Sequence, residues 1–313
     1  MKFLSDKVTF GRHETFALRY SWLSKGFQNL DIFDDEDAVV RLGVGKNMVS
    51  SIRYWLRACQ LITPQKPDQP EQMGSLIFDV KNGLDPYLED EATIWLVHWL
   101  LATNSTLATS WFWFFNKYHK PEFTGQELQT ALTDFIKEQV VEKRRPSAGT
   151  SKNDALLLPR MYSQSKGNGR TPLEEALDSP LSLLGLITQS AGGRAYQSKP
   201  AARPGLPIGI FAFAVSQLIN KREVTALPIE ELMYSRDDFA SPGSIFRLTE
   251  TDLITKLELM VDYIPGYFDI RETSGIHQLY QLNKIEPFEY IKKYYADIEK
   301  VGNQGVSTKG VAA

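Results

Sequence analysis

The chain has 313 residues, 42% of them hydrophobic, which suffices for the cores of two or three modest domains. Its net charge is −3 at pH 7, so an excess of positive charge that could attract a polyanion can only be local. The single cysteine, Cys59, excludes a disulfide within the chain and a cysteine-based zinc site, and it fits a reducing cytosol.

The first signal along the chain lies between Asp37 and Asp68, where five basic residues stand without an acidic one. We expect residues 38–42 to end a supporting helix and Gly43 to form a tight turn at positive φ. The helix that follows is capped by Gly45 and has Val49, Ile52 and Leu56 at helical spacing on its inner side. Together these elements predict a helix-turn-helix, whose second helix enters the DNA major groove.

We expect this helix-turn-helix to be winged, with residues 61–62 entering a first strand and residues 75–79 forming the return strand. The predicted DNA contacts on the second helix are Lys46, Asn47, Ser50, Ser51, Arg53, Tyr54 and Arg57. Bacterial one-domain regulators with this register usually carry Leu where this chain has Arg53, so Arg53 would face either the groove or a partner's surface. The alternative is a helical hairpin that only packs or docks protein.

Residues 93–116 contain no Asp, Glu, Lys or Arg, and they hold four of the six tryptophans. A run of this length could span a membrane, but residues 103–106 are polar and typical of a turn. We therefore expect two short buried helices, residues 94–102 and 107–118, whose aromatic side chains form the main core.

Residues 143–222 carry 12 basic and 4 acidic side chains, which is typical of a surface that faces a polyanion or of a solvated loop region. Just before them, Thr124 and Glu127 form a capping box that starts a helix to about residue 142. A second helix-turn-helix could follow with Ser151 as its cap, and residues 171–174 form another capping box. The DNA contacts expected in this region are Lys143, Arg144, Arg145, Lys152, Asn153 and Arg160.

The last third of the chain has an excess of acidic side chains, and Thr249 should cap a helix that runs to about Tyr263. The tail is rich in Gly, Ser and Thr and is expected to be disordered. We therefore predict a mainly α protein with short β-hairpin wings: a winged helix-turn-helix N-terminal module and further helical or winged-helix-like modules. The predicted boundaries are residues 1–120, 121–222 and 223–300, with a disordered tail at 301–313.

The sequence contains no recognisable catalytic motif, metal-ligand spacing or cofactor-binding motif, so we expect no catalytic residue, metal or cofactor. None of the four histidines pairs with another His, Cys or Glu at zinc-ligand spacing. We expect His98 at the edge of the core with a hydrogen bond, and residues 13–14 at the start of a helix rather than in acid–base work. An active site would have to assemble from residues that no motif marks. One such alternative is a nuclease that uses Asp85, Glu89 and Asp90 with magnesium.

Several motifs spread along the chain are specific in combination: Phe10–Phe16, Leu42–Val49, Ser51–Trp55, Asp85–Glu89, Trp111–Asn116, Ser241–Phe246 and Thr273–His277. Over residues 10–295 they resemble an uncharacterised prokaryotic family of about this length, known only as a domain of unknown function. Its genes often lie beside DNA phosphorothioation genes, including a sulfurtransferase resembling phosphoadenosine-phosphosulfate reductase, and beside other phage-defence genes. The resemblance implies DNA as the partner and defence as the setting, and it supplies no catalytic residues.

The expected function is therefore DNA binding within a phosphorothioation or related anti-phage restriction-modification system, as a regulator or target-recognition subunit. The expected partners are duplex DNA and protein subunits of such a complex, with a homodimer also open and no membrane. Residues 1–6 lack the long apolar region of a secretory signal, so we expect a cytoplasmic protein. Two alternatives are a non-catalytic adaptor that docks modification enzymes through the acidic last third, and the metal-dependent nuclease.

Overall fold

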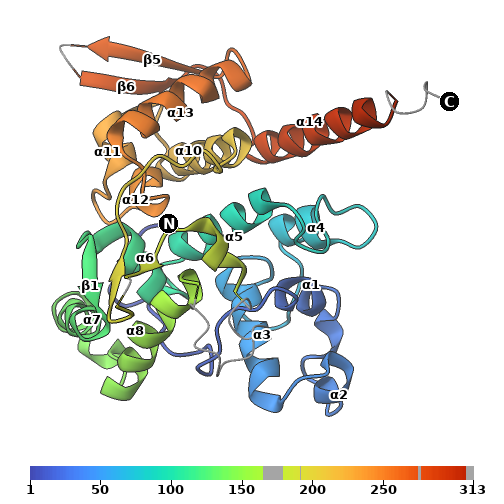
Figure 1. Ribbon diagram of the computed structural model, residues 1–313, viewed down its shortest axis with the longest axis vertical. Coiled ribbons are helices and arrows are strands. Elements are labelled where there is room, and N and C mark those ends of the chain that lie inside the picture. Colours follow the sequence, from blue (N-terminus) through green and yellow to red (C-terminus); the bar gives the residue numbers. More distant parts are fainter. Residues whose placement is uncertain (165–178, 191, 274–275, 308–313) are drawn as a thin grey trace. The chain divides into compact units, whose positions relative to one another are not determined.

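The computed structural model describes residues 1–164, 179–190, 192–273 and 276–307. The protein is mixed α and β, about 52% helical, with two small antiparallel three-stranded sheets (Figure 1). The chain divides into two compact units. Unit 1 comprises residues 1–201, 235–240 and 244–247, and unit 2 comprises residues 202–234, 241–243 and 248–313.

These units differ from the three modules predicted from the sequence. The predicted boundary at residue 120 falls inside unit 1, because strand β1 (Glu122–Thr124) pairs with strand β3 (Ala195–Gln197). Helices on both sides of that boundary also pack on helix α8 (Ala148–Tyr162). The predicted boundary at residue 222 falls inside unit 2.

Unit 1 begins with the predicted pair of helices and the turn between them. Its first elements are α1 (Trp22–Phe27), η1 (Leu30–Ile32), α2 (Ala38–Leu42), α3 (Lys46–Ala58) and α4 (Gln72–Phe78). Gly43 turns the chain between α2 and α3 with a φ of +62°, a conformation that glycine adopts without steric cost. Helix α3 buries Val49, Ile52 and Leu56 on its inner side, as predicted.

The wing predicted after α3 is wrong. Residues 75–79 were expected as a return strand, and all but the last of them lie in α4. The buried residues Met73 and Ile77 are four apart, which is the spacing of one helical side rather than of a strand. Between α3 and α4, where the structure describes every residue, the strand pairing consists of one antiparallel bridge between Ile62 and Pro70.

The charge-free aromatic segment forms two buried helices, α5 (Glu91–Thr103) and α6 (Thr109–Lys117), close to the predicted ranges. His98 lies fully inside this core rather than at its edge. Its Nε2 donates to the Ile245 carbonyl at 2.9 Å, and its Nδ1 accepts from the Tyr162 hydroxyl at 2.8 Å. Among the residues described, no helix is both long and apolar enough to cross a bilayer.

The rest of unit 1 holds a small sheet and two long helices. These elements are β1, α7 (Gly125–Gln139), η2 (Glu142–Arg144), α8, η3 (Pro180–Leu184), β2 (Thr188–Gln189) and β3, and the sheet order is β1-β3-β2. The capping box of Thr124 and Glu127 starts α7 as predicted. Ser147 caps α8, so the predicted cap at Ser151 is wrong by one helical turn. The capping box expected at residues 171–174 lies outside the described residues.

Part of unit 2 repeats the order of β1, α7, α8, β2 and β3 in unit 1. Unit 2 contains α10 (Ile208–Arg222), β4 (Ala226–Pro228), α11 (Ile229–Met233), α13 (Glu250–Tyr263), β5 (Phe268–Thr273), β6 (Ile276–Gln281) and α14 (Phe288–Ser307); α12 (Pro242–Ile245) falls partly in each unit. The sheet order is β4-β6-β5, and Thr249 caps α13 as predicted. Helix α14 continues to Ser307, because a helix anchored by buried residues extends at little cost. The disorder predicted for residues 301–313 stays a prediction, and residues 308–313 lie outside the described part.

Candidate nucleic-acid interface

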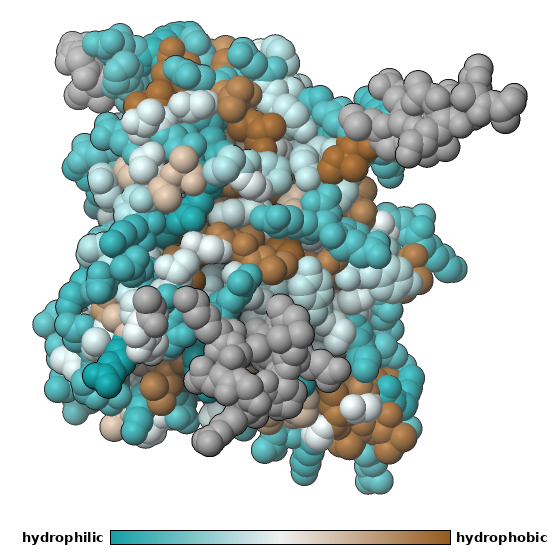
Figure 2. All heavy atoms as spheres, in the orientation of Figure 1, coloured by the Kyte–Doolittle hydropathy of each residue, from teal (hydrophilic) through white to brown (hydrophobic). Residues whose placement is uncertain are grey.

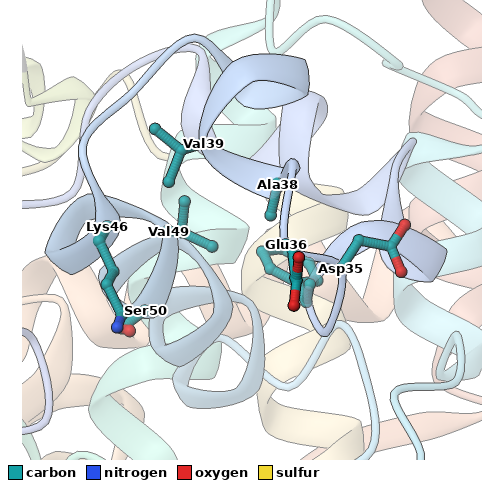
Figure 3. Close-up of a pocket in the computed structure, with 8 residues that line it drawn as sticks. Asp35, Glu36, Ala38, Val39, Lys46, Val49 and Ser50 are labelled. Carbon is teal, nitrogen blue, oxygen red and sulfur yellow. The ribbon is translucent and has the colours of Figure 1, made fainter.

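The start of α3 keeps part of the predicted contact set at the surface. Lys46, Asn47 and Ser50 are exposed there. Lys46 and Ser50 line one side of a hollow of about 340 Å³, and Asp35 and Glu36 line the other side (Figure 3). Because two carboxylates line the same hollow, Lys46 does not belong to a purely positive surface.

The neighbouring surface of α2 is apolar. Val39 is 38% exposed and Val40 is 79% exposed. Hydrophobic atoms gather at the lower right of Figure 2, where α2 lies in Figure 1. The N-terminal helix pair therefore presents a surface of mixed character, which is not what phosphate groups select.

The two arginines of α3 are paired with carboxylates. The Arg53 guanidinium donates to both carboxylate oxygens of Asp34, at 2.8 and 3.1 Å, and it also contacts Asp68. Arg57 donates to the same Asp68, whose side chain is 3% exposed. Hydrogen bonds from Arg53 and then Lys66 hold the pKa of Asp34 well below its usual range. The loop after α3 thus brings Asp68 back over the helix, where it pairs with both arginines, so each could contact a phosphate only by giving up that ion pair.

We expect Arg53→Ala to reduce stability rather than DNA affinity. Its removal weakens the compensation of the buried Asp68 carboxylate and should cost about 1–3 kcal/mol in the free energy of unfolding. Denaturant unfolding followed by tryptophan fluorescence measures this, with Arg41→Ala on the exposed surface of α2 as the control. A tenfold loss of DNA affinity at unchanged stability would contradict the structural role of Arg53.

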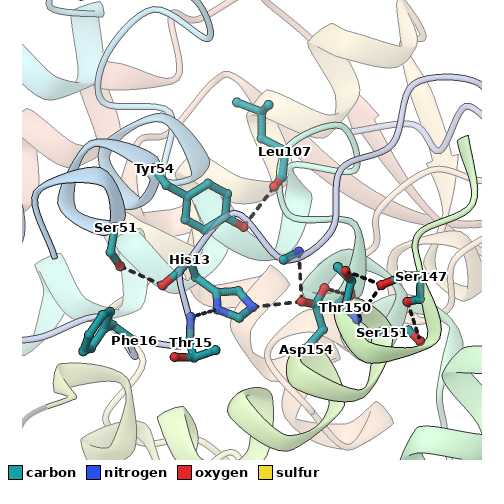
Figure 4. A network of polar contacts seen from close by, with 12 residues as sticks. His13, Thr15, Phe16, Ser51, Tyr54, Leu107, Ser147, Thr150, Ser151 and Asp154 are labelled. Atoms are coloured by element: carbon teal, nitrogen blue, oxygen red, sulfur yellow. Dashed lines mark hydrogen bonds and ion pairs between the residues drawn. The ribbon is translucent and has the colours of Figure 1, made fainter. Parts of the chain in front are cut away.

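Two other predicted contacts, Ser51 and Tyr54, lie in the core. The Ser51 hydroxyl donates to the His13 carbonyl at 3.0 Å, and the Tyr54 hydroxyl donates to the Leu107 carbonyl at 3.0 Å (Figure 4). Burial raises the pKa of Tyr54 well above its ordinary value. Because the segments around His13 and Leu107 cover this side of α3, Ser51 and Tyr54 leave the predicted contact set.

Helix α8, by contrast, carries its predicted contacts at the surface. Lys152, Asn153 and Arg160 are all exposed, and Leu156 between them is 45% exposed. Lys152, Leu156 and Arg160 are spaced by four and so form one stripe along the helix. Within the part of the chain that the structure describes, neither Lys152 nor Arg160 forms an ion pair. Asp154 is the sole acidic residue of α8 and is fully buried, so the outward side of this helix is positive.

Further basic side chains flank α8 in the chain. Lys143, Arg144 and Arg145 are exposed on or beside η2. The Arg145 guanidinium donates to the carbonyl of Val140, at 3.0 Å, and to the carbonyl of Lys137 in α7. Part of its hydrogen-bonding capacity is therefore used at the C-terminal end of that helix. Arg194 is exposed in the turn between β2 and β3 and was missing from the predicted contacts. An arginine directly after a Gly-Gly pair in a basic loop was the available signal for a hairpin tip.

A buried polar network connects α8 to the rest of unit 1 (Figure 4). His13 Nδ1 accepts from the Thr15 backbone at 3.1 Å, so the proton is on Nε2, which donates to Asp154 at 2.8 Å. Asp154 also accepts from the Ser110 hydroxyl at 2.6 Å and from the Gly11 backbone at 3.0 Å. Both His13 and Asp154 are fully buried. Since the carbonyl of His13 also accepts from α3, this network fixes α8 and α3 to one N-terminal segment.

The model of a family described as a protein of unknown function, DUF4007, matches residues 10–295. The chain belongs to this family. Two crystal structures are similar to it, one of SspB with a TM-score of 0.80 and one of magnesium ion-bound SspB with a TM-score of 0.79. Each is 27% identical in sequence, with 95% of this chain and 90% of the other chain covered. No curated protein matches the chain.

The carboxylates of Asp85, Glu89 and Asp90, named above for a metal-dependent nuclease, do not gather into a metal site among the described residues. The carboxylate of Asp85 accepts from the backbone of Glu89 at 2.8 Å, from the backbone of Asp90 at 3.1 Å and from the Thr93 hydroxyl at 2.5 Å. These bonds order the turn that leads into α5. Among the described residues, no group of three or more His, Cys, Asp and Glu is placed to hold a metal ion. Burial raises the pKa of Cys59, so its thiol is a poor nucleophile.

Proposed function

We propose that this DUF4007 protein binds duplex DNA through unit 1, with α8 as the helix that enters the major groove. The observation that supports this most is the outward stripe of Lys152, Leu156 and Arg160, which is positive and has no exposed acidic residue on its helix. Neutralising phosphates with unpaired Lys and Arg is the main source of affinity for DNA. Arg53 and Arg57 are already paired with Asp68, so they could neutralise phosphates only by losing those bonds.

The order of elements supports a winged helix at this position rather than at the N-terminus. β1, α7, α8, β2 and β3 follow one another, and β1 pairs with β3 at the centre of the sheet. In a winged helix-turn-helix the second helix of the pair reads the groove, which here is α8. The hairpin of β2 and β3 then corresponds to the wing, with Arg194 at its turn.

The exposed residues divide into two roles. Asn153 suits base edges, since an Asn side chain can bond adenine in a bidentate manner, and Leu156 suits the methyl group of thymine. The phosphate contacts would be Lys143, Arg144, Lys152, Arg160 and Arg194, with Arg145 in part. Lys46, Asn47 and Ser50 at the start of α3 remain candidates for a second, weaker contact.

The cellular setting is part of the proposal. The resemblance noted in the sequence associates the DUF4007 family with genes for DNA phosphorothioation and phage defence. We place the protein there as a cytoplasmic regulator or target-recognition subunit of a modification or restriction system. Comparing plain and phosphorothioated duplexes of one sequence by fluorescence anisotropy would show whether the modification is read.

Charge reversal on α8 tests DNA binding directly. We expect Lys152→Glu with Arg160→Glu to weaken duplex binding at least about tenfold and to reduce the slope of log K against log salt by about two, one for each lost phosphate contact. Anisotropy over a salt series measures both quantities.

The control variant is Arg271→Glu with Lys292→Glu in unit 2, which changes the net charge equally at exposed positions. This control changes the net charge by the same amount but leaves the surface of α8 intact, so it should bind DNA as the unaltered protein does. Equal binding by the α8 variant and the control would overturn the proposal.

A further inference from the structure

Helix α13 of unit 2 occupies the same place in its element order as α8 does in unit 1. It follows β4 and α11 and precedes the hairpin of β5 and β6, whose sheet order β4-β6-β5 matches that of the first sheet. The two helices have similar lengths, 14 residues for α13 and 15 for α8. The charges on their outward sides are opposite.

The outward side of α13 is acidic. Glu250, Glu258 and Asp262 are exposed, and none of them forms an ion pair within the described residues. The sole basic residue of α13, Lys256, is 6% exposed, and its ammonium group donates to the Leu206 carbonyl at 3.2 Å. Each helix thus buries its one residue of the minority charge, Asp154 in α8 and Lys256 in α13. A helix with this outward charge would repel the phosphates of DNA.

Both helices also expose a leucine within their charged stripe. Leu259 is 53% exposed and lies next to Glu258 and near Asp262, while Leu156 is 45% exposed and lies between Lys152 and Arg160. An apolar anchor rimmed by charges is the usual composition of a protein–protein contact. The rims here carry opposite signs, so contact between the two faces would be attractive and leucine could meet leucine.

We propose that the α13 face of one copy docks on the α8 face of a second copy. Glu258 and Asp262 would meet Lys152 and Arg160 around the leucine pair. The contact is head-to-tail, since it joins two different surfaces. It uses the face that we assign to DNA, so DNA and the second copy compete for α8. The competition rests on the proposed function, whereas the docking of the two faces does not.

A charge-swap experiment on the full chain tests the docking. We expect sedimentation velocity at 50 mM NaCl to show reversible self-association that is lost at 500 mM NaCl. The variant Glu258→Lys with Asp262→Lys should weaken association at least about tenfold, as should Lys152→Glu with Arg160→Glu. In the first variant both faces are positive and in the second both are negative, so an equimolar mixture of the two should associate again. The control with Arg271→Glu and Lys292→Glu should associate as the unaltered chain does.

Two results would overturn the docking: an unaltered chain that stays monomeric at low salt, or a mixture that fails to regain association. The assignment of α8 to DNA is tested separately from the docking. A duplex should dissociate the self-associated protein, and the Glu258→Lys, Asp262→Lys variant should bind DNA at least as tightly as the unaltered chain. If the mixture associates but a duplex does not compete, the docking stands and the assignment of α8 to DNA is wrong.

Discussion

Replacing Arg247 with alanine is expected to lower the free energy of unfolding of unit 1 by about 3–5 kcal/mol. Arg247 is 4% exposed, and its guanidinium donates to the Phe114 and Tyr118 carbonyls at 2.9 Å and to the Phe115 carbonyl at 3.3 Å. These carbonyls lie in the last turn of α6 or just after it, where the helix leaves acceptors without partners of its own. The positive charge also opposes the negative end of the helix dipole.

The loss is large because several buried groups lose their partners together. The Arg247 guanidinium also donates to the Ser198 hydroxyl at 3.0 Å and lies over the rings of Phe114 and Phe115. Alanine would leave a cavity and at least three carbonyls without a donor, and each unmade bond costs about 1–3 kcal/mol before relaxation. Denaturant unfolding measures the effect, with the exposed Arg12→Ala as a control that should stay within about 0.5 kcal/mol. Equal midpoints for the two variants would contradict the role of Arg247.

The sequence predicted the helices of the N-terminal pair better than their surface. Gly43 and the apolar positions of α3 located the turn and the inner side, because both are local signals. The window that looked purely basic ended at Asp68, and that residue folds back to pair with Arg53 and Arg57. No local pattern predicts an ion pair made by closing a loop, so the strongest sequence signal was assigned to a surface that is largely neutralised.

The second helix pair shows the opposite outcome. The side chains predicted there as DNA contacts are exposed in the structure, but the pairing of the short strands around the two helices was not predicted. The strands are two or three residues long, too short for an alternating pattern, and β1 pairs with a strand about 75 residues later, from Glu122 to Gln197. The alternation of buried and exposed residues along α8 was readable, whereas the pairing of distant short strands was not.

Asp154→Ala is expected to lower the free energy of unfolding of unit 1 by about 3–5 kcal/mol, because it removes a buried acceptor shared by three donors. The His13 imidazole, the Ser110 hydroxyl and the Gly11 backbone would each lose a partner. Gly11 approaches α8 so closely that a Cβ there would lie 2.4 Å from Thr150 Cγ2, so the N-terminal segment packs directly against this helix. The mutation should also weaken DNA binding, since the network fixes the position of α8.

The effect of Asp154 can be separated from a general loss of packing by a double-mutant cycle with His13→Ala. If the pair acts as one unit, the double variant should lose less stability than the sum of the two single variants, by about 1–3 kcal/mol. The matched variant Asn153→Ala lies one residue away at the surface and should change stability by less than about 0.5 kcal/mol. Additive losses from His13 and Asp154 would show that the two residues act independently, and the network would then not be what holds α8 against the N-terminal segment. A non-additive loss of stability, with normal helix content and weakened DNA binding, would link the buried pair to the position of the proposed reading helix. Variants of Lys152 and Arg160 cannot test this link, because these two residues lie at the surface.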